Sequence, residues 1–214
     1  MALLPKVAET ASSTYYYRPA DGRLDYKLDA KQQKVQPVYE DDITPGFASK
    51  RVREIRKFPN GSVEDLCQRV EMYYDNAVPT DGDYGVTAYG YGRVSGVRYK
   101  AQNCTQTFVE QYSYTIYGAM VTKRLKVIRG GASGVLATVA EYDGEGRLKS
   151  ITYPVTGRKV QYGFNDRGLP TTLTDVTGGG TLLVSSVTYG VAGEVTNFLS
   201  IGGSESRSYN EMGR

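Results

Sequence analysis

Three short acidic segments are the first places in this sequence where metal chemistry could occur. Glu40-Asp41-Asp42 places three carboxylates side by side, and Asp75-Asn76 is followed by Asp81-Gly-Asp83. Calcium binds such oxygen ligands, but its best-known loop needs Asp-x-Asp-x-Asp-Gly spacing and a distal Glu, which these segments lack. We interpret them as solvated loops and expect no metal site, with a calcium site as the alternative.

The residue types needed for most nucleophilic catalysis are missing. The chain has no histidine, which excludes Ser-His and Cys-His nucleophile pairs and any zinc site with a histidine ligand. Its 23 acidic residues contain no distinctive pair for glycoside hydrolysis. The short glycine clusters at 90–92 and 130–131 lack the strand-loop-helix context of a phosphate cradle and are interpreted as turns. We expect no catalytic residue, no cofactor and no enzymatic activity.

Cys67 and Cys104 are the two cysteines of the chain. Two thiolates are too few for a metal cage but enough for one disulfide in an oxidising compartment. We favour two unpaired, half-buried thiols, and the disulfide is the alternative.

Charge and hydropathy argue against nucleic acid and membrane as partners. The net charge is +3, and Lys and Arg are scattered instead of forming a dense basic patch. No segment approaches the roughly 18 consecutive apolar residues of a membrane span. The segment from Met1 to Lys6 lacks a basic start and is interrupted at Pro5, so we expect no signal peptide.

A repeated aromatic-x-x-x-Gly motif predicts the elements that position these residues. The chain has 19 Tyr, which favours strands, and 25 Gly, which favours tight turns. Five copies of the motif follow one another in the second half: Tyr114 to Gly118, Tyr142 to Gly146, Phe164 to Gly168, Tyr189 to Gly193 and Tyr209 to Gly213. Looser copies begin at Tyr17 and Tyr74. Such internal repetition indicates an array of similar modules.

One module reads as a β-hairpin. Val160, Tyr162 and Phe164 alternate with polar residues or Gly, as in a half-buried strand. After the aromatic anchor, the side chain of Asp or Asn can accept hydrogen bonds from backbone N–H groups. Gly then supplies the positive φ that closes a type I turn with a bulge. We therefore predict an all-β fold, an array of antiparallel β-hairpin repeats forming a curved sheet. The tyrosines are expected to form the strand core, and stacking on sugars is the alternative.

The segment Tyr142-Asp-Gly-Glu-Gly-Arg-Leu148 resembles the YD-repeat signature Tyr-Asp-x-x-Gly-Arg-Leu, and residues 209–214 resemble its first part. This repeat occurs in Rhs proteins, bacterial insecticidal Tc toxins and animal teneurins. In the copies at Phe164 and Tyr189, Leu169 and Glu194 replace the signature arginine. The resemblance implies a strip of sheet that spirals into a hollow shell on a secreted or cell-surface protein, which encloses a toxin domain or mediates carbohydrate binding.

Self-cleavage is not carried over from complete Rhs shells, because no Asp in this chain precedes a Pro. We expect irregular, insertion-rich repeats over residues 1–110 and regular repeats over 111–214, truncated at the C-terminus. The expected function is a non-catalytic wall segment of such a shell, and the alternative is a carbohydrate-binding module that uses exposed Tyr. The expected partners are neighbouring repeats of the full-length protein, carbohydrate and an enclosed toxin domain not in this chain. The structural anchors are Tyr114, Gly118, Tyr142, Asp143, Gly146, Arg147, Leu148, Phe164, Gly168, Tyr189, Gly193, Tyr209, Gly213 and Arg214.

Overall fold

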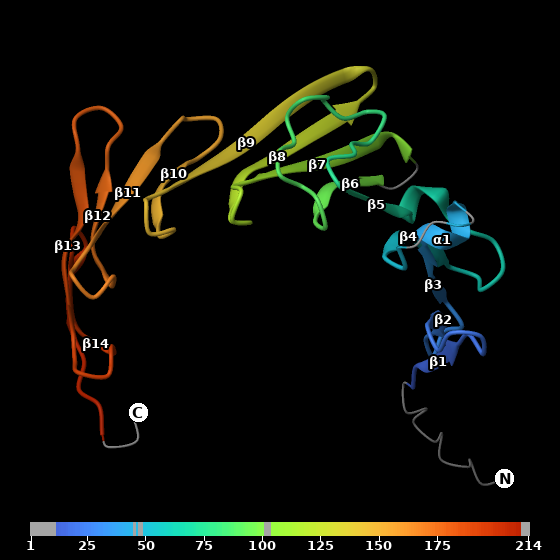
Figure 1. The fold of residues 1–214 in the computed structure, drawn as a ribbon, viewed down its shortest axis with the longest axis horizontal. Helices are drawn as coiled ribbons and strands as arrows, with labels where there is room; N and C mark the ends of the chain where they lie inside the picture. Colours follow the sequence, from blue (N-terminus) through green and yellow to red (C-terminus); the bar gives the residue numbers. More distant parts are fainter. Residues whose placement is uncertain (1–11, 45, 47–48, 101–103, 211–214) are drawn as a thin grey trace, which may run out of the picture. The chain divides into compact units, whose positions relative to one another are not determined.

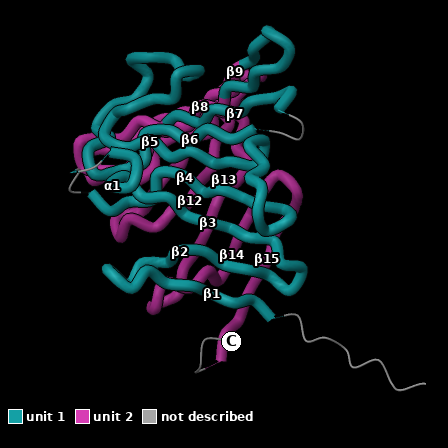
Figure 2. The backbone as a smooth tube through the Cα atoms, turned by 90° about the vertical axis from the view of Figure 1, so that its right-hand side faces the viewer, with its two compact units in different colours: residues 1–111, 126–134 teal, residues 112–125, 135–214 magenta. Residues whose placement is uncertain are grey.

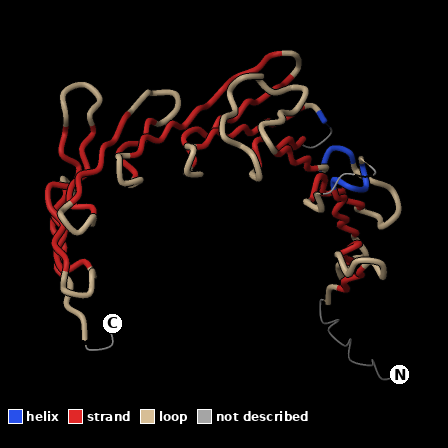
Figure 3. The backbone as a smooth tube through the Cα atoms, viewed as in Figure 1, coloured by secondary structure: helices blue, strands red, loops and turns tan. Residues whose placement is uncertain are grey.

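The computed structural model describes residues 12–44, 46, 49–100 and 104–210. Within these residues the chain is almost entirely β-strand and turn (Figure 3). Fifteen strands are hydrogen-bonded in their sequence order, β1 to β15. The strand pairs whose registers are resolved are antiparallel, as in the ladders between β1 and β2 and between β11 and β12. The predicted array of antiparallel β-hairpins is confirmed. The N-terminal segment Met1 to Lys6 and the anchors Gly213 and Arg214 lie outside the described residues.

The chain divides into two compact units (Figure 2). Unit 1 comprises residues up to 111 together with 126–134, and unit 2 comprises residues 112–125 together with 135–214. The strands that lie wholly in unit 1 are β1 (Thr14–Tyr17), β2 (Leu24–Leu28), β3 (Lys34–Tyr39), β4 (Val52–Phe58), β5 (Val70–Tyr74) and β6 (Val94–Lys100).

Three longer strands contribute residues to both units, namely β7 (Gln106–Tyr114), β8 (Met120–Arg129) and β9 (Ala132–Tyr142). The strands that lie wholly in unit 2 are β10 (Leu148–Thr152), β11 (Lys159–Phe164), β12 (Pro170–Asp175), β13 (Thr181–Tyr189), β14 (Val195–Ser200) and β15 (Gly203–Ser206). Figure 1 labels most of these strands along the chain.

Two short helical segments interrupt the connections in unit 1. The α-helix α1 (Glu40–Ile43) follows β3, and the 3₁₀ helix η1 (Leu66–Gln68) precedes β5. Asp65 begins η1, since its side chain accepts a hydrogen bond from the backbone N–H of Cys67 at 2.9 Å. A capping carboxylate satisfies one of the donors that a helix start leaves unpaired.

Few apolar side chains of the described residues are fully buried. Val109 in unit 1 and Val160 in unit 2 have exposed fractions of 0% and 5%. Many larger apolar residues, including Tyr84 and Val191, remain exposed. The hairpins are therefore held largely by cross-strand hydrogen bonds and by side-chain contacts between neighbouring strands.

Cys67 and Cys104 form a disulfide, with their Cα atoms 4.9 Å apart. Our preferred interpretation of two unpaired thiols was wrong. Cys67 lies in the connection between β4 and β5, and Cys104 lies in the connection between β6 and β7. Because chain direction alternates in an antiparallel array, these two connections lie at the same end of the strands. A sequence separation of 37 residues gives no sign of this proximity.

Candidate functional site: the repeated hairpin turns

An aromatic residue ends every odd-numbered strand from β1 to β13: Tyr17, Tyr39, Tyr74, Tyr114, Tyr142, Phe164 and Tyr189. Tyr142 lies opposite Leu148, the first residue of β10, and Phe164 lies opposite Pro170, the first residue of β12. The register shifts beside both aromatics. Such a bulge increases the local twist and redirects the neighbouring side chain.

The turn after Tyr142 uses every polar group of its Asp. The backbone N–H of Asp143 donates to the carbonyl of Arg147 at 3.0 Å, and the N–H of Gly146 donates to the carbonyl of Asp143 at 3.0 Å. The Oδ1 atom of Asp143 accepts from the N–H groups of Glu145 and Arg147 at 3.0 and 2.9 Å. Gly146 has a φ of +79°, in the left-handed region that favours glycine.

Arg147 completes this turn through its side chain. Its Nε donates to Oδ2 of Asp143 at 2.7 Å. The hydrogen bond from this guanidinium holds the pKa of Asp143 below its ordinary value, and the bonds from the backbone N–H groups of Arg147 and Glu145 act in the same direction. Both oxygens of Asp143 are thus engaged within the turn, which leaves this carboxylate a structural role.

The next turn repeats the arrangement with Asn in place of Asp. Oδ1 of Asn165 accepts from the N–H groups of Arg167 and Leu169, each at 3.0 Å. Gly168 has a φ of +75°. An amide oxygen can replace the carboxylate oxygen because the shared acceptor atom makes the same two backbone contacts.

The copies at Tyr114 and Tyr189 keep the glycine and lose the acidic residue. Gly118 and Gly193 have φ values of +95° and +89°. The N–H of Thr115 donates to the carbonyl of Ala119 at 2.7 Å, and the N–H of Gly190 donates to the carbonyl of Glu194 at 2.8 Å. The backbone geometry of the turn is therefore shared by copies whose side chains differ.

Several anchor tyrosines also bind the preceding even-numbered strand through their hydroxyl groups. Each hydroxyl donates to the carbonyl of that strand's first residue. The bonds run from Tyr39 to Leu24 (3.0 Å), from Tyr74 to Val52 (2.7 Å), from Tyr142 to Met120 (2.9 Å), from Tyr209 to Val195 (2.9 Å) and from Tyr189 to Pro170. We call each such contact between an anchor aromatic and the start of the preceding even-numbered strand a junction.

Three arginines that directly precede even-numbered strands lie over the anchor aromatic of the next hairpin. The guanidinium carbon of Arg23 is 4.3 Å from the ring centre of Tyr39, and that of Arg51 is 4.2 Å from the ring centre of Tyr74. Arg147 lies 4.8 Å from the ring centre of Phe164. A cation at this distance is attracted by the ring face.

Sequence reasoning missed Tyr39 as an anchor. The helix α1 and the residues after it separate Tyr39 from Val52, which hides the short motif. The signal that remains is Arg51-Val52, an arginine before an apolar strand start, as in Arg23-Leu24 and Arg147-Leu148.

The acidic segments of the sequence lie in arginine and lysine networks. Asp41 binds Arg23 at 2.8 Å, and Glu40 binds Arg51 at 2.8 Å. Asp42 binds Arg18 at 2.7 Å, Asp75 binds Arg51 at 2.5 Å, Asp81 binds Arg98 at 3.4 Å and Asp83 binds Lys126 at 2.8 Å. Across the described part of the chain, no group of three or more His, Cys, Asp or Glu residues is arranged to hold a metal ion.

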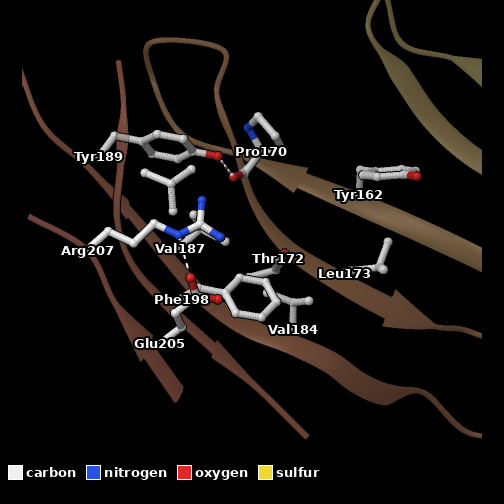
Figure 4. Close-up of a pocket in the computed structure, with 11 residues that line it drawn as sticks. Tyr162, Pro170, Thr172, Leu173, Val184, Val187, Tyr189, Phe198, Glu205 and Arg207 are labelled. Carbon is white, nitrogen blue, oxygen red and sulfur yellow. Dashed lines mark hydrogen bonds and ion pairs between the residues drawn. The ribbon is translucent and has the colours of Figure 1, made fainter. Parts of the chain in front are cut away.

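A shallow hollow of about 330 Å³ lies over strands β11 to β15 in unit 2. Figure 4 shows its lining, which is mainly apolar and includes Tyr162, Leu173, Val184, Val187 and Phe198. Its charged pair, Glu205 and Arg207, forms an ion pair at 2.6 Å. The hollow offers a mainly apolar surface.

The described residues contain no helix long and apolar enough to cross a membrane.

Residues 142–181 match the family model of the RHS repeat. The match begins at the Tyr142 anchor and includes the turn of Phe164. The comparison with curated protein sequences found no match.

Solved structures of Tc-toxin components share the fold of this chain. The structure described as TcdB2-TccC3 covers 94% of the chain with a TM-score of 0.70 and 15% identity. TcdB2-TccC3-Cdc42 covers 94% with a TM-score of 0.68 and 14% identity. A mutant form of the Photorhabdus luminescens Tc holotoxin pore covers 94% with a TM-score of 0.67 and 14% identity. The chain spans 10% of each matched chain.

Proposed function

We propose that the chain is a segment of a YD/RHS-repeat protein and serves as a non-catalytic wall segment of a shell-forming protein. The observation that carries this proposal is the use of the signature's polar groups. Asp143 is engaged by two backbone N–H groups and by Arg147, and the hydroxyl of Tyr142 is engaged by a backbone carbonyl. Groups committed in this way build turns and connect strands, and they are not left available for a substrate.

The matched pair Asp143→Asn and Asp143→Ala in the full chain tests the structural role. Asn keeps the acceptor for the two backbone N–H groups, as Asn165 does naturally, but its NH2 group cannot accept from Arg147, so we expect a smaller loss of thermal stability than for Ala. Ala removes the acceptor, and we expect a loss of about 1 kcal/mol. If Asp143→Asn left folding unchanged and abolished an activity of the parent protein, the non-catalytic assignment would be wrong.

The parent protein is proposed to be secreted or displayed at the cell surface and to enclose a cargo domain. The Cys67–Cys104 disulfide supports an oxidising compartment, since reducing cytosol keeps such thiols free. Alkylation of intact cells before and after reduction tests this location. We expect both cysteines to be labelled only after reduction. Labelling without reduction would contradict the proposal.

An exposed tyrosine loop supports carbohydrate binding as a second candidate function. The connection between β5 and β6 carries Tyr84, Tyr89 and Tyr91, whose exposed fractions are 78%, 54% and 75%. The buried side chain of Gln111 fixes this loop, because it accepts from the N–H of Asp83 at 3.0 Å and donates to its carbonyl at 2.9 Å. Aromatic rings on a fixed backbone can stack on sugar rings without a large ordering cost.

A glycan array probed with the wild-type chain and with Tyr84→Ala/Tyr91→Ala tests this candidate. We expect binding that the double variant loses while its circular dichroism stays unchanged. Absence of wild-type binding to every glycan would remove carbohydrate binding and leave the wall function untouched.

A further inference from the structure

We infer that the signature arginine and the anchor tyrosine hydroxyl make two interchangeable contacts, either of which can couple neighbouring hairpins at a junction. We call each of these two contacts a fastener. The arginine belongs to the turn of one hairpin, and the aromatic belongs to the next hairpin along the chain. This inference goes beyond the wall function, because it states how neighbouring repeats are coupled and where that coupling is strong or weak.

The junction at Phe164 carries the argument. Phenylalanine has no hydroxyl, so it cannot donate to the carbonyl of Leu148, the residue that corresponds to the acceptors in the other junctions. Here the guanidinium of Arg147 lies over the ring, 4.8 Å from its centre. The same guanidinium remains bonded to Asp143 at 2.7 Å. The arginine thus connects its own turn to the following hairpin.

The junctions at Tyr142, Tyr189 and Tyr209 show the complementary case. The residues that stand in the arginine position before their acceptor strands are Ala119, Leu169 and Glu194. None of these side chains can supply a cation, and all three tyrosine hydroxyls donate to the preceding strand. Each of these three junctions therefore lacks the arginine and keeps the tyrosine hydroxyl.

In unit 1, the junctions at Tyr39 and Tyr74 have both fasteners. The hydroxyl of Tyr39 binds the carbonyl of Leu24 while Arg23 lies over its ring. The hydroxyl of Tyr74 binds the carbonyl of Val52 while Arg51 lies over its ring. Removal of one fastener should consequently be tolerated better at these two sites than at a junction with a single fastener.

A double-mutant cycle on the full chain tests the Phe164 junction. The variants are Arg147→Ala, Phe164→Leu and their combination, and the readout is hydrogen exchange of β10 to β12 measured by mass spectrometry. Leu keeps apolar bulk but removes the ring face. We expect a coupling of about two- to fivefold in the local opening equilibrium constant, as for an exposed cation over a ring.

Arg158→Ala provides the matched control in the same unit. Arg158 also binds an Asp, with Nε 2.7 Å from Oδ2 of Asp175, but it does not lie over an anchor ring. Its cycle with Phe164→Leu should show no coupling. Equal coupling in both cycles, or none in the Arg147 cycle, would overturn the inference while leaving the wall function standing.

Phe164→Tyr adds a rescue experiment. In the Arg147→Ala background the new hydroxyl should reach the carbonyl of Leu148 and restore exchange protection to β10 to β12. In parallel, Tyr142→Phe should increase local opening by more than Tyr39→Phe does, because the ring of Tyr39 retains Arg23 and also Arg18. Failure of the rescue, or equal effects of the two Tyr→Phe changes, would contradict interchangeable fasteners.

Discussion

At the turn after Tyr189 the signature's Asp and Arg are replaced by Gly190 and Glu194. A Cβ atom placed on Gly190 would lie 1.9 Å from Oε1 of Glu194, so the carboxylate occupies the space that the Asp side chain uses in the Tyr142 turn. The other oxygen of Glu194 is buried without a hydrogen-bond partner. A buried unpaired acceptor destabilises the fold, because it loses its contacts with water and gains none in return.

We therefore expect Gly190→Asp/Glu194→Arg to stabilise unit 2. The new Asp would accept the turn's N–H groups, and the new Arg would bind it, as Asp143 and Arg147 do. The gain in free energy of unfolding should be about 1 kcal/mol, measured by urea denaturation. Gly190→Asp alone should destabilise, because it places a second carboxylate against Glu194. A double variant no more stable than the wild type would contradict this explanation.

Asp42 makes the folding stability of unit 1 depend on pH in the acidic range. The hydrogen bond from Arg18 and that from the backbone N–H of Tyr39 lower the pKa of Asp42 to about 2, against an opposing effect of desolvation. Because the folded pKa lies below the unfolded value, the stabilisation is complete above about pH 4 and is lost as the pH falls through 2. Denaturation of Asp42→Asn across this range should show a weaker pH dependence than the wild type. Equal slopes would show that another carboxylate is responsible.

At the scale of the hairpin, the roles of Gly146, which has a positive φ, and of Gly144 in the same turn can be distinguished by substitution. Gly146 has a φ of +79°, and an added Cβ would have no atom within 4 Å. Gly146→Ala should therefore cost about 1–2 kcal/mol through backbone conformation alone. Gly144 in the same turn also has open space around it but no positive φ, so Gly144→Ala should be nearly neutral in thermal denaturation. Equal costs for the two changes would contradict this assignment.

The hairpins themselves were predictable because strand alternation and turn chemistry are local. The Tyr142 and Phe164 copies could be predicted from the Asp or Asn and the Gly that follow each anchor within four residues. The junctions were not predictable in this way. The hydroxyl of Tyr142 binds Met120, which is 22 positions away, and only the pairing of strands brings them together. Tyr39 was missed for a related reason, since α1 lengthens its turn beyond the motif.

At the scale of the molecule, the Cys67–Cys104 disulfide joins two connections of unit 1 that are 37 residues apart in sequence. A crosslink over a loop of this length reduces the entropy of the unfolded chain and is expected to contribute about 3 to 4 kcal/mol. Reduction, or Cys67→Ser/Cys104→Ser, should therefore increase hydrogen exchange in β4 to β6. Strands β10 to β14 belong to unit 2 and should exchange as before. Uniform loss of protection in both units would instead show that the chain unfolds as one cooperative body.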